Sequence, residues 1–156
     1  MDNVSLILPK RRRPEWVPDT EELAVAEAEM ATIPLLGHIA AGHPLDVVEQ
    51  SESVRVPANM VRKNAYALRV RGHSMVDDGI QDGDVIVVDK RETAENGQSV
   101  VAMINGEQVT LKRFYVESDG IRLQPAHPDM APIHLRNEEV EILGIVTGVI
   151  RQPDGA

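Results

Sequence analysis

From Ile33 onward the chain consists of short runs rich in β-branched residues, and this pattern constrains the fold more than any other feature. Turn-forming sequences separate the runs, among them Asp82-Gly83-Asp84, Ser118-Asp119-Gly120 and two Asn-Gly pairs. Val, Ile and Thr favour extended backbone, and Asn-Gly favours the tight turn of a hairpin. We therefore predict a mostly β, compact domain of roughly seven short antiparallel strands with hairpins.

Particular strands follow from the same pattern. MINGEQVTLKRF predicts a hairpin that turns at Asn105-Gly106. The final run, EVEILGIVTGVI, is long, apolar and close to the C-terminus. As an unpaired edge it would promote aggregation, so we expect it to pair in a homodimer. The other predicted strands are ESVRVP, AYALRVRG, DVIVVD, SVVAMING, EQVTLKRFYV and GIRLQP.

Residues 1–32 differ in composition and form a predicted N-terminal arm, short and flexible or partly helical. KRRRPEWVPD is basic and broken by prolines, whereas DTEELAVAEAEMA favours a helix with Asp19 as its N-cap. The arm is too short for the three helices of a helix-turn-helix domain. The Lys10–Arg13 cluster could contact phosphates, but a solvated charge cluster is the simpler interpretation.

The composition limits which cellular compartment and which binding partners are expected. The chain has no cysteine, so it can form neither disulfides nor thiolate metal sites. Only 3% of its residues are aromatic, so Val, Ile, Leu and Met must fill its core. Its net charge of −9 opposes non-specific attraction to DNA or anionic membranes. No apolar run approaches the ~20 residues of a membrane span. We expect a cytoplasmic protein that binds no membrane and for which direct DNA binding is doubtful.

Ser74, in the stretch RVRGHSMVDDGIQDGD, is the first candidate for chemistry. It could be an ordinary turn or cap serine, a member of a Ser-His-acid triad, or the nucleophile of a Ser-Lys dyad. A triad fits poorly, because Val76 stands where a nucleophile elbow needs a small residue. Adjacent His73 is also poorly placed, since neighbours in extended chain point in opposite directions.

Lys112 is the lysine that could act as a base. It lies in the middle of QVTLKRFYV, and strand alternation places it on one face with Thr110 and Phe114. If that face is buried, desolvation lowers the pKa of the amine toward 7 or 8. The alternative is an exposed lysine that protects a sheet edge.

The sequence predicts neither a metal site nor a cofactor. DDGIQDGD lacks the spacing and the closing glutamate of an EF-hand, so Asp82-Gly83-Asp84 is interpreted as a turn into the next strand. The five histidines lack zinc-ligand spacing.

Four stretches in order carry a family resemblance: RVRGHSMVDDGIQDGDVIVVDK, NGQSVVAMINGEQVTLKRF, LQPAHPDMAPIHL and EVEILGIVTGVIR. Together they resemble the self-cleaving domain of LexA-type repressors and of UmuD, from about Ile33 to Arg151. The resemblance implies Ser74 as nucleophile, Lys112 as general base, and the backbone amides of His73 and Ser74 as an oxyanion site.

The same resemblance implies that the chain carries its own substrate. IPLLGHIAAGHPL is similar to the LexA cleavage region, which identifies Ala41-Gly42 as the expected scissile bond. Small residues suit this role because they let the backbone approach a catalytic serine closely. The chain then divides into an arm (1–32), a cleavage-site segment (33–50) and a Ser-Lys peptidase domain (51–156).

Three biological roles are consistent with this resemblance. The protein is a UmuD-like factor that binds a translesion polymerase after cleavage, a LexA-like repressor without its DNA-binding half, or a non-catalytic interaction module. The presence of both Ser74 and Lys112 disfavours the last. The resemblance further implies activation by RecA filaments on single-stranded DNA in the SOS response.

Overall fold

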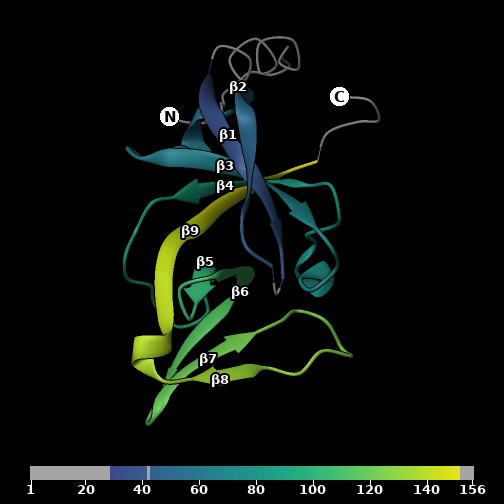
Figure 1. Ribbon diagram of the computed structural model, residues 1–156. Helices are drawn as coiled ribbons and strands as arrows, with labels where there is room; N and C mark the ends of the chain where they lie inside the picture. The colour runs from purple at the N-terminus through teal and green to yellow at the C-terminus, as the bar shows by residue number, and fades with distance from the viewer. Residues whose placement is uncertain (1–28, 42, 152–156) are drawn as a thin grey trace, which may run out of the picture.

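The computed structural model describes residues 29–41 and 43–151. Nine strands and three single-turn 3-10 helices lie in this part of the chain (Figure 1). The strands are β1 (Met30–Ala40), β2 (Asp46–Pro57), β3 (Ala65–Arg71), β4 (Val85–Asp89), β5 (Ser99–Ile104), β6 (Gln108–Glu117), β7 (Gly120–Gln124), β8 (Ile133–Leu135) and β9 (Val140–Ile150). The 3-10 helices are η1 (Ala58–Met60), η2 (Val76–Asp78) and η3 (Asn137–Glu139). The prediction of a mostly β fold with hairpins is confirmed.

All nine strands form one sheet in the order β2-β1-β3-β4-β9-β5-β6-β7-β8. Neighbouring strands are antiparallel except β1 and β3, which run parallel. This exception departs from the purely antiparallel prediction: β2 returns along one edge of β1, and β3 then runs along the other. The strands are also not uniformly short, since β2 has 12 residues and β9 has 11.

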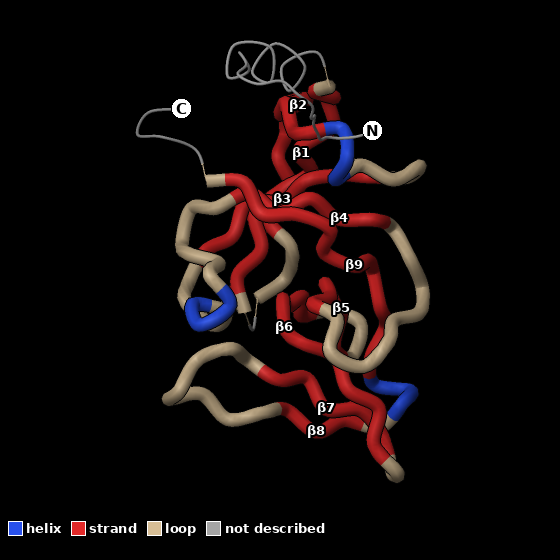
Figure 2. Tube along the Cα trace, turned by 180° about the vertical axis from the view of Figure 1, so that it is seen from behind, coloured by secondary structure: helices blue, strands red, loops and turns tan. Residues whose placement is uncertain are grey.

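Strand β9 joins two halves of the sheet. Figures 1 and 2 show β1–β4 gathered in one half, β5–β8 in the other, and β9 running between them. Its register shifts twice, once against β4 and once against β5, leaving Thr147 and Leu143 as bulge residues. The Thr147 hydroxyl donates to the carbonyl of Met60 at 2.6 Å, and the Tyr66 hydroxyl donates to that of Leu143 at 3.3 Å. Bulges bend a strand, so β9 can pair with β4 in one half and with β5 in the other.

The position of β9 corrects one prediction. The final run was expected to be an unpaired edge strand, but β9 lies inside the sheet with β4 and β5 on its two sides. Its apolar residues are therefore used within the chain. The edge argument for dimerisation is wrong, and the homodimer remains a prediction that rests on family resemblance.

Only the end of the predicted arm lies within the described residues. Residues 1–28 lie outside the described residues, including Lys10–Arg13 and most of the helix predicted for residues 19–31. Its last residues, Met30 and Ala31, instead begin β1, where they pair with Pro57 and Val56 of β2. The strand therefore begins before the predicted boundary at residue 32. No helix within the described residues is long and apolar enough to cross a membrane.

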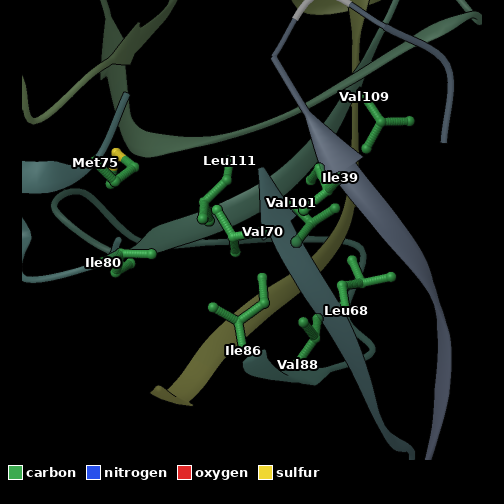
Figure 3. Packing of buried hydrophobic residues seen from close by; sticks show 10 residues of the cluster. All are labelled: Ile39, Leu68, Val70, Met75, Ile80, Ile86, Val88, Val101, Val109 and Leu111. Carbon is green, nitrogen blue, oxygen red and sulfur yellow. The ribbon is translucent and has the colours of Figure 1, made fainter. Parts of the chain in front are cut away.

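Three apolar clusters form the core, and valine is frequent in two of them. The largest cluster packs the segment after β3 against β1, β3, β4, β5 and β6 (Figure 3). Its residues are Ile39, Leu68, Val70, Met75, Ile80, Ile86, Val88, Val101, Val109 and Leu111. A second cluster lies under β1–β4, and a third surrounds Phe114 and Leu123. The core thus relies on aliphatic packing, as the low aromatic content requires.

Gly144 marks the tightest packing along β9. A Cβ at this position would overlap Val88 Cγ1 and lie 2.9 Å from the carbonyl oxygen of Asp89. We expect Gly144→Ala to lower the free energy of unfolding by roughly 2 kcal/mol, because overpacking forces the bulged strand away from β4. Urea unfolding measures this. Gly148→Ala on the same strand is the control, since the three atoms nearest its Cβ all belong to the flexible Met60 side chain. Equal losses in the two variants would contradict the packing argument.

Candidate active site

Ser74 lies in a turn between β3 and β4, here called the Ser74 turn (residues 72–79). Glycines with positive φ stand at both ends, Gly72 at 97° and Gly79 at 81°. Such angles are readily adopted only by glycine, so these residues let the chain leave β3 and turn back. The Gly72 amide donates to Asp82 Oδ1 at 2.8 Å. Met75 is buried in the largest core cluster and anchors the turn, while Ser74 is partly exposed.

The Asp82-Gly83-Asp84 stretch forms a turn before β4, as predicted. Asp84 Oδ2 accepts a hydrogen bond from the Gln81 amide at 2.8 Å. Asp84 also forms an ion pair with Arg151, with 3.0 Å between Oδ1 and Nε. Burial raises the pKa of the Asp84 carboxyl, but the hydrogen bonds from Arg151 and the Gln81 amide together with the Arg151 charge outweigh it, so this pKa lies below its ordinary value. Among the described residues, no group of three His, Asp or Glu side chains could hold a metal ion.

Lys112 lies in the middle of β6 and is buried. The residue is 4% exposed, and the alternating neighbours Thr110 and Phe114 are buried on the same face. The alternative of an exposed edge lysine is therefore wrong. Burial among apolar groups penalises the ammonium and lowers the pKa of Lys112 from 10.5 to about 8.

The fold brings Ser74 and Lys112 together across 38 residues of sequence. Lys112 Nζ lies 3.3 Å from Ser74 Oγ, 2.6 Å from Thr110 Oγ1 and 3.3 Å from the Leu111 carbonyl oxygen. Within the described residues, Lys112 is the one hydrogen-bond partner of the Ser74 hydroxyl. A lysine with a lowered pKa beside a serine hydroxyl can remove its proton and activate it as a nucleophile.

Sequence reasoning missed two residues that support this pair. Strand alternation placed Thr110 on the same face as Lys112 but gave it no role. In the structure its hydroxyl accepts a hydrogen bond from the Lys112 amine and so orients that amine. Ala126, in the loop between β7 and β8, donates its amide to the Ser74 carbonyl at 2.8 Å and accepts from the Asp77 amide at 2.7 Å. Strand alternation could have identified Thr110. Ala126 makes only backbone contacts, so its side chain gives no signal.

The edge of β6 beside Lys112 is open for a short distance. Strand β7 pairs with β6 only from Arg113 onward, and His43 forms an isolated antiparallel bridge with Val109. The Val109 amide donates to the His43 carbonyl at 2.9 Å. Between these two contacts, residues 110–112 have no strand partner on this side among the described residues. Extended chain could lie there.

The segment that contains the expected scissile bond reaches this open edge. Ala40, at the end of β1, pairs with Arg71 of parallel β3, three residues before Ser74. The His43 amide donates to the Ala40 carbonyl at 3.2 Å and Ala41 lies in a turn, so this segment is here called the 40–43 turn. Ala41 is exposed and, together with Lys112, lines a pocket of about 320 Å³. Gly42 lies outside the described residues.

The two amides expected at an oxyanion site lie in the Ser74 turn. Within the described part of the chain, neither the His73 amide nor the Ser74 amide donates a hydrogen bond. Both donors are thus available to a ligand. The His73 side chain is exposed.

Comparison with known proteins identifies a family and a set of relatives. The family model described as Peptidase S24-like matches residues 34–147, a range that includes Ser74 and Lys112. The LexA repressor of Clostridioides difficile is 48% identical over 132 residues, covering 83% of this chain and 63% of the relative. That of Syntrophobacter fumaroxidans is 45% identical over 131 residues, with the same coverage of both chains. The LexA repressor of Bacillus subtilis is 42% identical over 134 residues.

The chain thus spans a little under two thirds of the length of these relatives. The matched region contains the whole described sheet except the first four residues of β1 and the last three of β9. On the strength of the family match and these identities, the chain belongs to the Peptidase S24-like family and is related to LexA repressors.

Proposed function

We propose that this protein is an autoproteolytic serine endopeptidase that cuts its own Ala41-Gly42 bond in the response to DNA damage. One observation carries the proposal: the buried amine of Lys112 lies 3.3 Å from the Ser74 hydroxyl oxygen. The approach of the 40–43 turn to the same site supplies a substrate. Family membership and relatives that are LexA repressors support the biological setting.

The chemistry is acyl transfer from nitrogen to oxygen. Neutral Lys112 takes the proton of the Ser74 hydroxyl as Oγ attacks the carbonyl carbon of Ala41. The negative charge that develops on the Ala41 oxygen is stabilised by the amides of His73 and Ser74. When the carbon–nitrogen bond breaks, protonated Lys112 returns its proton to the amine of Gly42. Water then hydrolyses the Ser74 ester and releases the free enzyme.

The position of the turn determines when this reaction occurs. The 40–43 turn is tied to β6 by the bridge between His43 and Val109, and Ala41 lines the same pocket as Lys112. Cleavage requires the Ala41 carbonyl to move within reach of Ser74 Oγ in extended form. A conformational step of this kind commonly limits the rate. We propose that RecA filaments on single-stranded DNA favour the extended form, and that the protein acts as a cytoplasmic homodimer.

Two downstream roles follow from cleavage. Relatives that are LexA repressors favour inactivation of a transcriptional repressor. A UmuD-like protein would instead become able to bind a translesion polymerase. A gel shift with an operator-like duplex and the complete gene product separates them: binding that is lost on cleavage supports the repressor, and no binding before or after cleavage supports the UmuD-like role.

The proposal predicts a specific pH dependence. Because the pKa of Lys112 is about 8, the fraction of neutral amine rises with pH. We expect the self-cleavage rate to rise about tenfold per pH unit below pH 8 and to level off above about pH 9. Purified protein is incubated from pH 6 to pH 10, and mass spectrometry identifies fragments 1–41 and 42–156. The absence of these fragments at alkaline pH, with or without RecA filaments, would overturn the proposed function.

A further inference from the structure

A second contact between the Ser74 turn and β6 lies next to the Ser74–Lys112 pair. Asp78 ends η2, four residues after Ser74, and Arg113 directly follows Lys112. The Arg113 guanidinium donates through Nε to Asp78 Oδ2 at 2.9 Å and through its terminal nitrogen to Asp78 Oδ1. This two-point arrangement is the strong, geometrically specific form of an ion pair.

The two contacts hold the turn from opposite faces of β6. Strand alternation places Lys112 on one face and Arg113 on the other, together with Leu111. Leu111 belongs to the core cluster that contains Met75, the residue between Ser74 and η2. The turn therefore reaches Lys112 through Ser74 Oγ, while its following residues pack and pair on the Leu111–Arg113 face. Movement of η2 away from this face would carry Ser74 with it.

Other contacts of the turn do not replace this one. Ala126 holds the backbone of Ser74 and Asp77, but it belongs to the loop between β7 and β8 and not to β6. Within residues 29–41 and 43–151, Asp78–Arg113 is the one ion pair that joins the Ser74 turn to β6. The Asp78 side chain is 16% exposed, so its carboxylate is partly shielded from competing water. Hydrogen bonding with Asp78 raises the pKa of Arg113, which is charged at every working pH.

We propose that Asp78 and Arg113 are positioning residues that hold Ser74 Oγ within hydrogen-bonding distance of Lys112 Nζ, an inference that rests on the proposed self-cleavage. Neither group touches the reacting atoms. Their effect follows from distance, because proton transfer requires close approach, and a displacement of about 1 Å can reduce a rate about 100-fold. Arginine is required because lysine cannot offer two donors in one plane.

The test compares self-cleavage rates of the wild type, Asp78→Asn, Arg113→Gln and the double variant across the same pH series. We expect each single change to lower the alkaline plateau about 10- to 100-fold without moving the midpoint, because Lys112 stays buried. The double variant should be no slower than the slower single variant, since both remove one interaction. Effects that multiply in the double variant would show that the two residues act separately and would overturn the inference.

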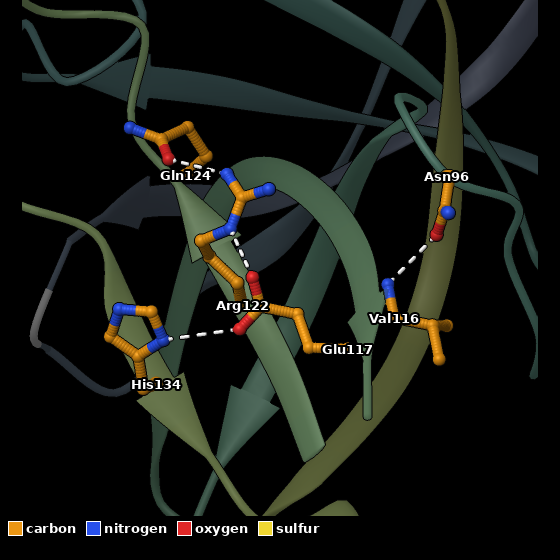
Figure 4. A network of polar contacts seen from close by, with 6 residues as sticks. All are labelled: Asn96, Val116, Glu117, Arg122, Gln124 and His134. Carbon is orange, nitrogen blue, oxygen red and sulfur yellow. Dashed lines mark hydrogen bonds and ion pairs between the residues drawn. The ribbon is translucent and has the colours of Figure 1, made fainter. Parts of the chain in front are cut away.

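Two further variants guard the interpretation. Arg122→Gln is the matched control: Arg122 of β7 pairs with Glu117 of β6 at 2.7 Å in the network of Figure 4, and among the described residues it makes no ion pair with the Ser74 turn. It should cleave at the wild-type rate. Arg113→Lys keeps the positive charge, so it serves as the test variant if Arg113→Gln does not fold. We expect the alkaline plateau of its self-cleavage rate to fall severalfold. A wild-type rate in folded Arg113→Lys would overturn the positioning role. If wild type itself never cleaves, the proposed function fails first.

Discussion

Replacing Ser74 with alanine is expected to abolish self-cleavage, with a fall of at least about 1,000-fold in the alkaline rate. The substitution removes the hydroxyl oxygen that lies 3.3 Å from Lys112 Nζ and leaves water as the only nucleophile. The fold should be unaffected, because the turn is anchored by Met75 and by backbone contacts with Ala126. Mass spectrometry of protein held at pH 9.5 for several wild-type half-lives measures the remaining fragment.

Ser118→Ala is the matched control for this experiment. Ser118 is exposed in the turn between β6 and β7, outside the site. It should cleave at the wild-type rate. Fragments 1–41 and 42–156 appearing from Ser74→Ala at a rate near that of wild type would remove Ser74 from the mechanism.

Replacing Lys112 with methionine should have two opposite effects: it abolishes cleavage and stabilises the fold. Methionine has similar length and no charge, so it fills the same buried site without an amine to take the Ser74 proton. Stability is measured in a Ser74→Ala background, so that the parent remains intact at every pH. At pH 7 we expect the added substitution to raise the free energy of unfolding by up to roughly 3 kcal/mol.

The sign of this stability change follows from the lowered pKa of Lys112. The unfolded chain binds the lysine proton up to about pH 10.5, whereas the folded chain releases it near pH 8. Folding below pH 8 must therefore bury the ammonium, which costs stability in full. Between pH 8 and 10.5 this cost declines, because the folded state holds the neutral amine. The advantage of methionine should fall below half its pH 7 value by pH 9.5.

Urea unfolding at pH 7 and pH 9.5 tests this pH window. Lys90→Met in the same background is the control, because Lys90 is exposed and should give the same small change at both values. An advantage of Lys112→Met that stays constant or grows with pH would show that the amine is not buried as a charge at neutral pH. The Tyr66 hydroxyl, whose pKa burial raises to about 12, is common to all variants and cancels in the comparison.

The sequence predicted the elements of this fold better than their arrangement. The β-branched runs and the Asn105-Gly106 turn correspond to strands and to the β5–β6 hairpin, because these signals act between residues close in the chain. Strand order is different, since it depends on contacts between distant segments. The parallel pairing of β1 with β3 and the interior position of β9 were therefore not foreseen.

The candidate site shows the same division. Its serine and lysine were identified from motifs and family resemblance, and strand alternation placed Lys112 with Thr110. The supporting contacts of Ala126 and Asp78 were not predicted. Ala126 acts through backbone groups that every residue has, and Asp78 stood in an acidic stretch interpreted as turn chemistry. Which acid pairs with which arginine depends on the two segments meeting in space.

By itself, the sequence determined the strand content, the aliphatic nature of the core and the identity of the nucleophile and base as candidates. These properties are local, because propensity, alternation and side-chain chemistry belong to each residue. Only the tertiary structure decided that Lys112 is buried, that Ser74 lies 3.3 Å from its amine, and that the 40–43 turn approaches the same edge. The physical reason is that desolvation and proton-transfer distance depend on the assembled surroundings, and β6 acquires those surroundings only when the neighbouring strands and the Ser74 turn pack against it.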